Sequence, residues 1–325
     1  MLYLPSVFKR LKPWFVVLAV LPFSVFAQNW PSKPITLIVT QGPGSGSDVI
    51  VRLLAGAMGV ALGQNVVVEN RTGGSGIIGH QYVARAPADG YTLLFSSTAI
   101  MLVVPAIHAS AKYSLADFAP AAPVLRAPYA VLVANKPEAP KTLAELIDVL
   151  RTKPSAYSST GPGTMTHLAT ELLLHKAGVT ATHVPYKGSG QSLTDLIGGQ
   201  VLFSTDSLTA AMSHIRSGKL RALAVTDLAR EQSLPDVPTL AESGFPGTRA
   251  VIIGGFFAPK GTPESILDRI AAVTAQTMQN PQIAQRFAAL ETSPLRMSNQ
   301  EFVEQLRKED LLWTPVIKQL DLKSE

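Results

Sequence analysis

The sequence predicts an α/β fold in which parallel sheets are covered by helices on both faces. Three observations lead to this prediction: short apolar runs alternate with amphipathic segments, the connections between them are short, and many connections are rich in Gly and Ser. This alternation is typical of parallel sheets, whose crossovers place helices on both faces. The expected strands are 35–40, 65–69, 91–96, 129–134, 156–160, 182–186, 201–205, 220–226 and 251–258.

Residues typical of helix ends support the helices that are expected between these strands. Thr142 with Glu145, and Ser298 with Glu301, have the spacing of capping boxes, and Gly218 stands where a helix should end. The expected helices are 47–62, 76–86, 142–152, 165–177, 190–198, 207–217, 263–279 and 298–318. The segment 227–247, which is rich in Pro, Gly and acidic residues, is expected to be a long connection.

The N-terminus has the pattern of a secretory signal peptide. Basic residues within positions 9–12 precede an apolar stretch at 14–27 that ends in the small residue Ala27. The stretch is shorter than the roughly 20 residues that span a bilayer. We therefore expect residues 1–27 to be a cleaved signal peptide and the protein to be periplasmic, with a retained anchor as the alternative.

Composition excludes several classes of function. The chain has 325 residues and no Cys, which excludes disulfides, thiol nucleophiles, cysteine metal sites and a lipidated cysteine. Three of the charges behind the formal net charge of +5 lie in the predicted signal peptide, and charged residues make up only 16% of the chain. No nucleic-acid partner is expected. A chain of this length favours two domains.

One sequence pattern recurs along the chain: an apolar strand that ends in a loop of small residues at the start of a helix. Such a loop leaves backbone N–H groups pointing outward at the positive end of the helix dipole, which favours an anion. The pattern occurs at 35–48 (ITLIVTQGPGSGSD), 73–79, 161–166 and 187–190. The chain is therefore expected to bind small anions.

Longer motifs resemble one protein family. They are WPSKPITLIV at 30–39, PGSGSD at 43–48, VVVENRTGGSGIIG at 66–79, DGYTLLF at 89–95, HVPYKGS at 183–189, LTDLIGGQV at 193–201, GKLRALAVT at 218–226 and LPDVPTLAESGFPG at 234–247. With these motifs the chain resembles the Bug family of extracytoplasmic solute receptors, the binding components of tripartite tricarboxylate transporters. The resemblance covers essentially the whole chain after the signal peptide.

The resemblance implies a periplasmic-binding-protein fold, in which two α/β domains joined by crossover strands close on a ligand in the cleft between them. It implies a discontinuous first domain at 28–127 and 250–325, and a second domain at 128–249. It further implies a monomer without cofactor, metal or catalytic residues, which captures a small mono- or dicarboxylate and delivers it to the membrane subunits of the transporter. The alternative partner is a two-component sensor kinase that reads the closed form.

The resemblance also places the ligand loops. Their helix N-termini and hydroxyl groups could hold a carboxylate without an arginine, partly through ordered water. The implied ligand-binding residues are Gln41, Ser45, Gly46, Ser47, Asp48, Ser75, Gly76, Ser97, Thr98, Thr160, Gly163, Thr164, Met165, Thr166, Tyr186, Gly188 and Asp206.

Three of the residues near these loops have a second interpretation. Asp48 lies in the first turn of its helix, so helix capping and dipole complementation are favoured over ligand contact. Asp206 either accepts a hydrogen bond from a ligand ammonium or hydroxyl group, or fixes its own loop. His167 follows a glycine loop, and a structural, hydrogen-bonded role is favoured over catalysis.

The chain departs from the family at three places. The family commonly has Pro-Phe at Thr40-Gln41, an aromatic residue at Thr205 and Trp-Phe at Ile253-Gly254. Each change replaces a bulky ring by a smaller or more polar group. Our hypothesis is a wider pocket that forms more hydrogen bonds; compensating repacking is the alternative.

An exported enzyme is the competing class of function. The segment 74–79 matches the GxGxxG dinucleotide fingerprint, but a spacer separates it from its strand and the next strand ends in Ser rather than an acid. No GxxxxGK[ST], GxSxG or HExxH motif occurs. An NAD-dependent or hydrolytic enzyme is therefore disfavoured.

Overall fold

The computed structural model describes residues 30–319. The predicted signal peptide, 1–27, lies outside the described residues. Within 30–319, no helix is both long enough and apolar enough to cross a membrane.

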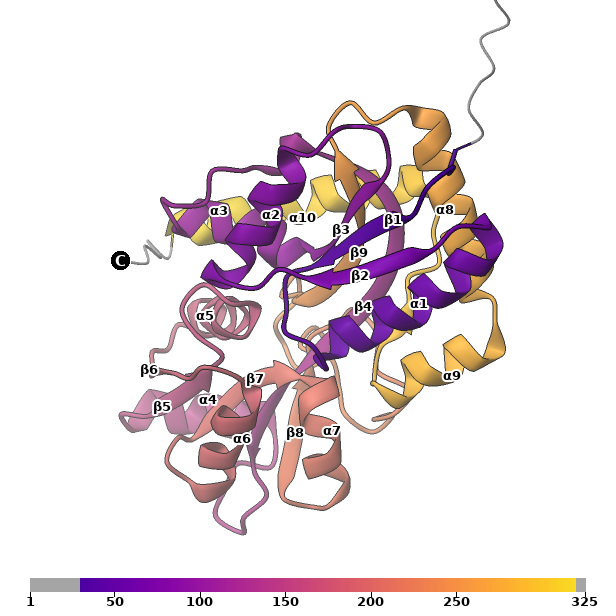
Figure 1. Ribbon diagram of the computed structural model, residues 1–325. Helices are drawn as coiled ribbons and strands as arrows, with labels where there is room; N and C mark the ends of the chain where they lie inside the picture. The colour runs from indigo at the N-terminus through magenta and orange to yellow at the C-terminus, as the bar shows by residue number, and fades with distance from the viewer. Residues whose placement is uncertain (1–29, 320–325) are drawn as a thin grey trace, which may run out of the picture.

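The strands form one mixed sheet whose two ends are parallel and whose middle is antiparallel (Figure 1). Its order is β2-β1-β3-β9-β4-β7-β5-β6, and β8 and β10 also pair with β4. β1 pairs in parallel with β2 and β3, and β5 with β6 and β7, as the strand–helix alternation predicted. The strands are β1 Ile35–Val39, β2 Val66–Asn70, β3 Thr92–Ser97, β4 Phe118–Ala134, β5 Ala156–Ser159, β6 Thr182–Pro185, β7 Phe203–Ser207, β8 Leu220–Val225, β9 Val251–Pro259 and β10 Ser293–Pro294.

β4 is the strand that both halves of the molecule share. Its residues 118–128 pair with β9, and its residues 129–134 pair with β7 and β8. Only 129–134 was predicted, because Pro120, Pro123 and Pro128 argue against a central strand. The ladder accommodates the first two of these prolines with register shifts at Pro120/Ala122 and Pro123/Leu125.

The expected helices are all present, within a few residues of their predicted ends. Glu301 N–H donates to Ser298 Oγ and Ser298 N–H to Glu301 Oε2, which confirms this capping box. Glu145 N–H donates to Thr142 Oγ1, which confirms the cap, but the Glu145 carboxylate accepts from Lys141 N–H instead of Thr142 N–H. The helices are α1 Gly46–Leu62, α2 Ile77–Ala84, α3 Val104–Ile107, α4 Leu143–Thr152, α5 Met165–Ala177, α6 Ser189–Gly198, α7 Leu208–Arg216, α8 Glu264–Met278, α9 Pro281–Ala289 and α10 Asn299–Gln319. The prediction missed α3, α9, β10, a π-helical turn at Ala99–Val103, and 3-10 turns at Gly74–Gly76 and Leu115–Asp117.

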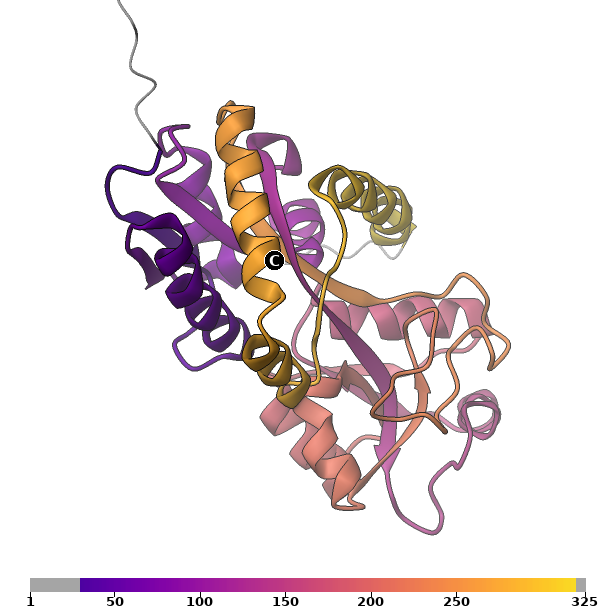
Figure 2. The same cartoon turned by 90° about the vertical axis from the view of Figure 1, so that its right-hand side faces the viewer.

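Helices cover the sheet on both sides, and each half has its own apolar core (Figures 1 and 2). In the upper half of Figure 1, α1 and α8 pack on one face, and α2 and α10 lie on the other. In the lower half, α4 and α5 pack against one cluster, and α6 and α7 against another. The observed fold is thus the periplasmic-binding-protein type that the sequence predicted. The domain limits 28–127 with 250–325, and 128–249, stay a prediction.

A buried ion network ties together the strands that pass between the halves. Asp227, just after β8, accepts from Arg126 of β4 at 2.8 Å and from Arg249, just before β9, at 3.3 Å. Arg249 also pairs with Glu309 of α10. Because these residues flank the points where the chain crosses, the network fixes the crossover strands to α10.

Candidate ligand-binding site

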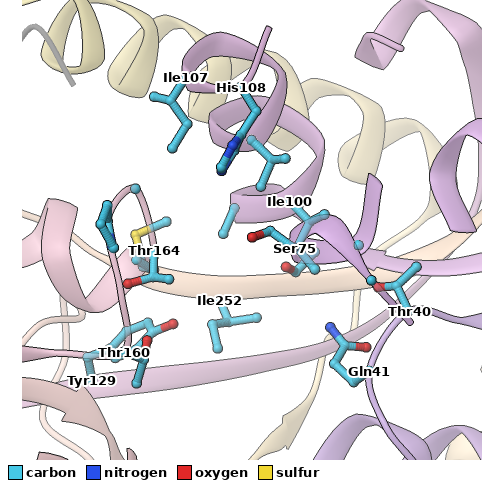
Figure 3. Close-up of a pocket in the computed structure, with 18 residues that line it drawn as sticks. Thr40, Gln41, Ser75, Ile100, Ile107, His108, Tyr129, Thr160, Thr164 and Ile252 are labelled. Atoms are coloured by element: carbon cyan, nitrogen blue, oxygen red, sulfur yellow. The ribbon is translucent and has the colours of Figure 1, made fainter. Parts of the chain in front are cut away.

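A cavity of about 440 Å³ lies where loops of the two halves face each other. Its lining comes from the ends of β1 and β3, the turn before α2, the segment 99–108, β4, the β5–α5 loop and β9 (Figure 3). The lining residues are Thr40, Gln41, Gly73, Ser75, Gly76, Ser97, Ala99, Ile100, Val104, Ile107, His108, Tyr129, Thr160, Pro162, Gly163, Thr164, Met165 and Ile252.

The lining contains hydroxyl, amide and apolar groups and the imidazole of His108, with no Lys, Arg, Asp or Glu among the described lining residues. Burial, followed by the negative charge of Asp206, raises the pKa of Tyr129, so its phenol stays neutral. Within 30–319, no group of three or more His, Asp or Glu residues is arranged to hold a metal ion. Apart from the imidazole of His108, the lining therefore offers an anion helix dipoles and hydrogen bonds.

α5 begins at the cavity without a side-chain cap. Its N-cap residue Thr164 turns its hydroxyl away from the helix and donates to Gly161 O at 2.7 Å. Thr166 Oγ1 instead accepts from Thr160 N–H at 2.9 Å, which fixes the loop. The first-turn N–H groups of α5 are left for another acceptor.

α2 begins at the same cavity, also without a side-chain cap. Its N-cap is Gly76, with φ +94°, and the preceding Ser75 has φ +55°. A Cβ at Gly76 would lie 3.2 Å from both Thr40 Oγ1 and a methyl group of Ile100, so the turn needs glycine for conformation and for space. The 3-10 turn and the start of α2 thus present backbone directly to the cavity.

A buried histidine supports each of these two loops. His80 of α2 donates from Nδ1 to Gly76 O at 2.8 Å, with Ser96 Oγ 2.7 Å from Nε2. His167 of α5 accepts the Gly163 N–H at Nδ1, 3.0 Å away. Burial lowers the pKa of both imidazoles to about 4, so both are neutral. The structural role predicted for His167 is confirmed.

Among the helices that start elsewhere, some carry a side-chain cap and some do not. α1, α4 and α7 are capped by the hydroxyl groups of Ser45, Thr142 and Ser207, each of which accepts an N–H of its first turn. α6 and α8 also begin without a side-chain cap, but away from the cavity. What distinguishes α2 and α5 is that their uncapped starts lie at the cavity.

The Ser45–Asp48 segment serves the start of α1 instead of lining the cavity. Asp48 is buried and accepts from Gly44 N–H at 2.9 Å, Arg52 Nε at 3.0 Å and Asn70 Nδ2 at 2.8 Å. Burial opposes ionisation, but these donors together hold the pKa of Asp48 below its ordinary value. Ser45 is therefore the cap of α1, whereas Asp48 complements the helix dipole from the first turn and fixes the preceding loop through Gly44.

Thr40 and Gln41 carry buried oxygen atoms without a protein partner. Both residues line the cavity, and Thr40 Oγ1 and Gln41 Oε1 have no hydrogen bond within the described residues. Only 5% of Thr40 is exposed, so its hydroxyl has little access to bulk water. An unpaired buried oxygen is costly, which favours a ligand or an ordered water at this position.

Asp206 lies behind the cavity wall. Its Oδ1 accepts from Ser189 Oγ and from Ser207 N–H, both at 2.7 Å, while Oδ2 is buried without a partner among the described residues. Burial raises the pKa of Asp206 to about 6. The bonds to Ser189 and Ser207 tie the starts of α6 and α7 together, which favours the loop-fixing interpretation.

The structure therefore brings together part of the predicted site. The predicted residues that line the cavity are Gln41, Ser75, Gly76, Ser97, Thr160, Gly163, Thr164 and Met165. Those that do not line it are Ser45, Gly46, Ser47, Asp48, Thr98, Thr166, Tyr186, Gly188 and Asp206. Tyr186, for example, donates its hydroxyl to Asp195 at 2.7 Å.

Only some of the positions where the sequence departs from the family line the cavity. Thr40 and Gln41 line the cavity, whereas Thr205 is fully buried outside it. Gly254 lies in the core, where a Cβ would meet Phe95 and Leu125, and it is Ile252 rather than Ile253 that faces the cavity. The wider-pocket hypothesis now depends on Thr40 and Gln41 alone.

Sequence reasoning missed the apolar part of the lining. Ile100, Val104 and Ile107 come from the π-helical turn and α3, and Ile252 from β9. The run AIMLVVPAI at 99–107 is apolar throughout and has no period that separates a buried face from a cavity face. A π-helical turn often marks a functional site, but its presence is visible only in the structure.

Relatives of the chain include a curated protein of Bordetella pertussis. The Bordetella protein, named BugT, is 35% identical over 313 residues, which cover 95% of this chain and 96% of BugT.

Solved structures confirm the fold. "R. palustris Rpa4515 with adipate" matches with a TM-score of 0.79 and 32% identity, over 90% of this chain and 99% of that chain. "MatC (Rpa3494) from Rhodopseudomonas palustris with bound malate" matches with a TM-score of 0.76 and 27% identity, over 89% of this chain and 100% of that chain. Residues 50–322 match the family described as "Tripartite tricarboxylate transporter family receptor". The chain belongs to this family of periplasmic solute-binding receptors.

Proposed function

We propose that the protein captures a small mono- or dicarboxylate in the cavity and delivers it, without chemical change, to the membrane subunits of a tripartite tricarboxylate-type transporter. The ligand-binding residues are those of the cavity lining, and the protein acts in the periplasm as a monomer. The neighbours that bind adipate and malate support a carboxylate ligand.

The observation that carries this proposal is the pair of uncapped helices. α2 and α5 both begin at the cavity without a side-chain cap, and their first-turn N–H groups therefore lie at its wall. α6 and α8 also lack a side-chain cap, but they begin outside the cavity. A carboxylate accepts hydrogen bonds from such N–H groups and is stabilised by the helix dipole. No basic side chain is then required.

The residues that line the cavity come from both halves of the molecule, so ligand binding favours closure of the two halves. Gln41 and Ser75 come from the half of the molecule that contains β1–β3, whereas Thr160 and Thr164 come from the half that contains β5 and α5. A ligand that contacts both sets binds the closed arrangement more tightly than an open one, so it shifts the population towards closure. The transporter would then recognise the closed form.

The test is a calorimetric and thermal-shift titration of residues 28–325 with aliphatic diacids, tricarboxylates, acidic amino acids, aromatic acids and NAD. A ligand at about 100 times its dissociation constant adds roughly 2.7 kcal/mol to the free energy of unfolding. We expect a response to carboxylates only. Gln41→Ala should weaken binding, whereas Gln200→Ala, at an exposed glutamine outside the cavity, should not. A response to NAD alone, or to none of the acids, overturns the proposal.

Delivery needs a separate experiment. Deletion of the gene should abolish uptake of the radiolabelled ligand, and complementation with the Gln41→Ala variant should restore it only at higher ligand concentration. If uptake persists in the deletion strain while a ligand-induced transcriptional response is lost, the protein is a sensor component rather than a transport receptor.

A further inference from the structure

We propose that the ion pair between Arg216 and Glu291, called here the clasp, holds the two halves of the molecule in the closed arrangement. Because ligand binding favours closure, the clasp strengthens binding from outside the ligand cavity. This inference rests on the proposed function and adds two positioning residues to it. Neither of them lines the ligand cavity, so both act through closure rather than through contact with the ligand.

The clasp joins the two halves. Arg216 is the last residue of α7, whose apolar side packs with β4 and α6 in the half that contains β5 and α5. Glu291 follows α9, which packs with α1 and α8 in the half that contains β1–β3. Arg216 Nη2 lies 2.7 Å from Glu291 Oε1, and Figures 1 and 2 both show α9 next to α7.

The backbone of Glu291 has a conformation that glycine usually provides. Thr292 N–H donates to Phe287 O at 3.0 Å, which closes the last turn of α9 around Glu291. Glu291 itself has φ +50°. The residue at this position after a helix is most often Gly, because a side chain is unfavourable in the left-handed region. A glutamate kept where glycine would be easier indicates a role for its side chain.

The carboxylate of Glu291 is nearly buried at the contact between the halves. Only 9% of its side chain is exposed, and Arg216 provides its one side-chain partner within 30–319. A buried carboxylate is costly unless it is paired. Glu291 therefore favours the arrangement in which α7 and α9 meet.

The structure that contains the clasp is the closed one. Gly163 and Ile107 come from different halves and touch across the ligand cavity, since a Cβ on Gly163 would lie 1.7 Å from Ile107 Cδ1. A rotation of one half that separates these two residues also changes the distance between α7 and α9. A shorter distance would overlap atoms, and a longer one would break the 2.7 Å contact. The clasp is therefore specific to closure.

The clasp and the ligand lie on opposite sides of β4. A second cavity, of about 470 Å³, is lined by residues of both halves that include Arg126, Arg216 and Glu291. Arg126 and Tyr129 are three positions apart in β4, so their side chains point to opposite faces. Tyr129 lines the ligand cavity. A change in the clasp can thus reach the ligand only through the relative position of the halves.

The first test is a double-mutant cycle with Arg216→Gln and Glu291→Gln, measured by calorimetry with adipate and malate as probes. Each single variant should weaken binding of the acid that the unsubstituted protein binds by about three- to tenfold. The double variant should lose no more than either single variant, because all three lack the same contact. Arg151→Gln is the matched control, since Arg151 pairs with Asp148 within α4, and it should leave affinity unchanged. Additive losses, or unchanged affinity in the single variants, overturn the inference.

Glu291→Gly separates closure from stability. Glycine suits the left-handed backbone at this position, so the melting temperature of the ligand-free variant should not fall below that of the unsubstituted protein. Its affinity should still fall by about three- to tenfold, because the clasp is lost. A lower melting temperature with unchanged affinity would show that Glu291 serves only the stability of α9, and it would contradict the inference.

The distance between the halves gives a measurement that needs no bound acid. The chain has no Cys, so Ile78→Cys and Lys187→Cys place one spin label at an exposed residue in each half. Without added acid, pulsed dipolar spectroscopy should show a smaller population of the short distance in Glu291→Gly than in the protein with the clasp. Equal populations overturn the clasp whatever the acids do. If the unsubstituted protein binds neither acid, the proposed function fails while this comparison still decides on the clasp.

Discussion

The imidazole rings of His167 and His183 lie stacked, with their centroids 4.0 Å apart and their planes inclined by 8°. The Tyr157 ring lies beside both imidazoles, with its centroid 5.0 Å from that of His183 and 6.3 Å from that of His167. Nδ1 of His167 accepts a hydrogen bond from the backbone N–H of Gly163, and Nε2 of His183 lies 2.6 Å from Ser159 Oγ. The stacked pair therefore supports both ends of the loop that forms one polar end of the cavity.

This pairing predicts that the protein loses stability in mild acid. Burial, followed by the charge of His183, lowers the pKa of His167 to about 4, and burial also lowers the pKa of His183. Unfolded histidines bind protons near pH 6.5, so between about pH 6.5 and 4 the unfolded state binds more protons than the native state. The free energy of unfolding should fall as the pH drops through this window, by on the order of 2 kcal/mol for His167 between pH 7 and 5.

Urea denaturation of the protein at several pH values checks this. His167→Gln should reduce the slope of stability against pH. The slope that remains should combine the contributions of His80 and His183 with an opposite contribution from Asp206, whose pKa is raised. Gln200→Ala, at an exposed residue that does not titrate, should leave the slope unchanged. Equal slopes in the native protein and His167→Gln would contradict the assignment.

Gly163 should tolerate no side chain. Its φ is +70°, and a Cβ would lie 1.7 Å from Ile107 Cδ1, across the cavity lining. Gly163→Ala should lower stability by about 1–3 kcal/mol and carboxylate affinity at least about tenfold, because the helix start is displaced. Ile107→Val removes the clashing atom and should restore part of the loss.

Gly188→Ala is the matched control for this prediction. Gly188 has an extended backbone with φ 172°, and nothing lies within 4 Å of its Cβ position. Calorimetry and thermal unfolding of the three variants check the result. Similar losses in Gly163→Ala and Gly188→Ala would show that the close approach to Ile107 is unimportant.

Gln41→Phe tests the wider-pocket hypothesis. A phenyl ring at this position fills part of the cavity and removes an amide donor, so the ligand should bind more weakly while the fold persists. Circular dichroism and thermal unfolding establish the fold, and calorimetry measures affinity. Unchanged affinity would mean that neighbouring side chains repack around the ring and that Gln41 does not shape the pocket.

Ser45→Ala tests the role assigned to the start of α1. Asp48 N–H donates to Ser45 Oγ at 3.2 Å, so loss of this cap should cost about 1 kcal/mol of stability and leave affinity unchanged. Thr142→Ala removes the corresponding cap of α4 and should have a similar effect. A tenfold loss of affinity in Ser45→Ala alone would place α1 in the site.

Local signals predicted most of the elements but only part of the site. α5 has the predicted bounds, 165–177, because a glycine loop, a Thr N-cap and Gly178 mark its ends. Ser45–Asp48 was assigned to the ligand because a Ser-Gly loop before a helix has the same sequence pattern whether its hydroxyl caps the helix or faces a cavity. Ser45 and Thr164 are both N-cap residues, and they differ in the direction of the side chain: the Ser45 hydroxyl caps its helix, whereas the Thr164 hydroxyl does not.

The sequence by itself determined the alternation of strands and helices, the family and the Gly/Ser loops, because periodicity, caps and motifs are local. The tertiary structure decided which loops face one another. Pairing of β4 with β9 and with β7 joins residues far apart in the chain, and this pairing carries Thr40 and Gln41 to the side of the cavity opposite Thr160 and Thr164. It also places Ile107 and Ile252 between them, which no local pattern of apolar residues specifies.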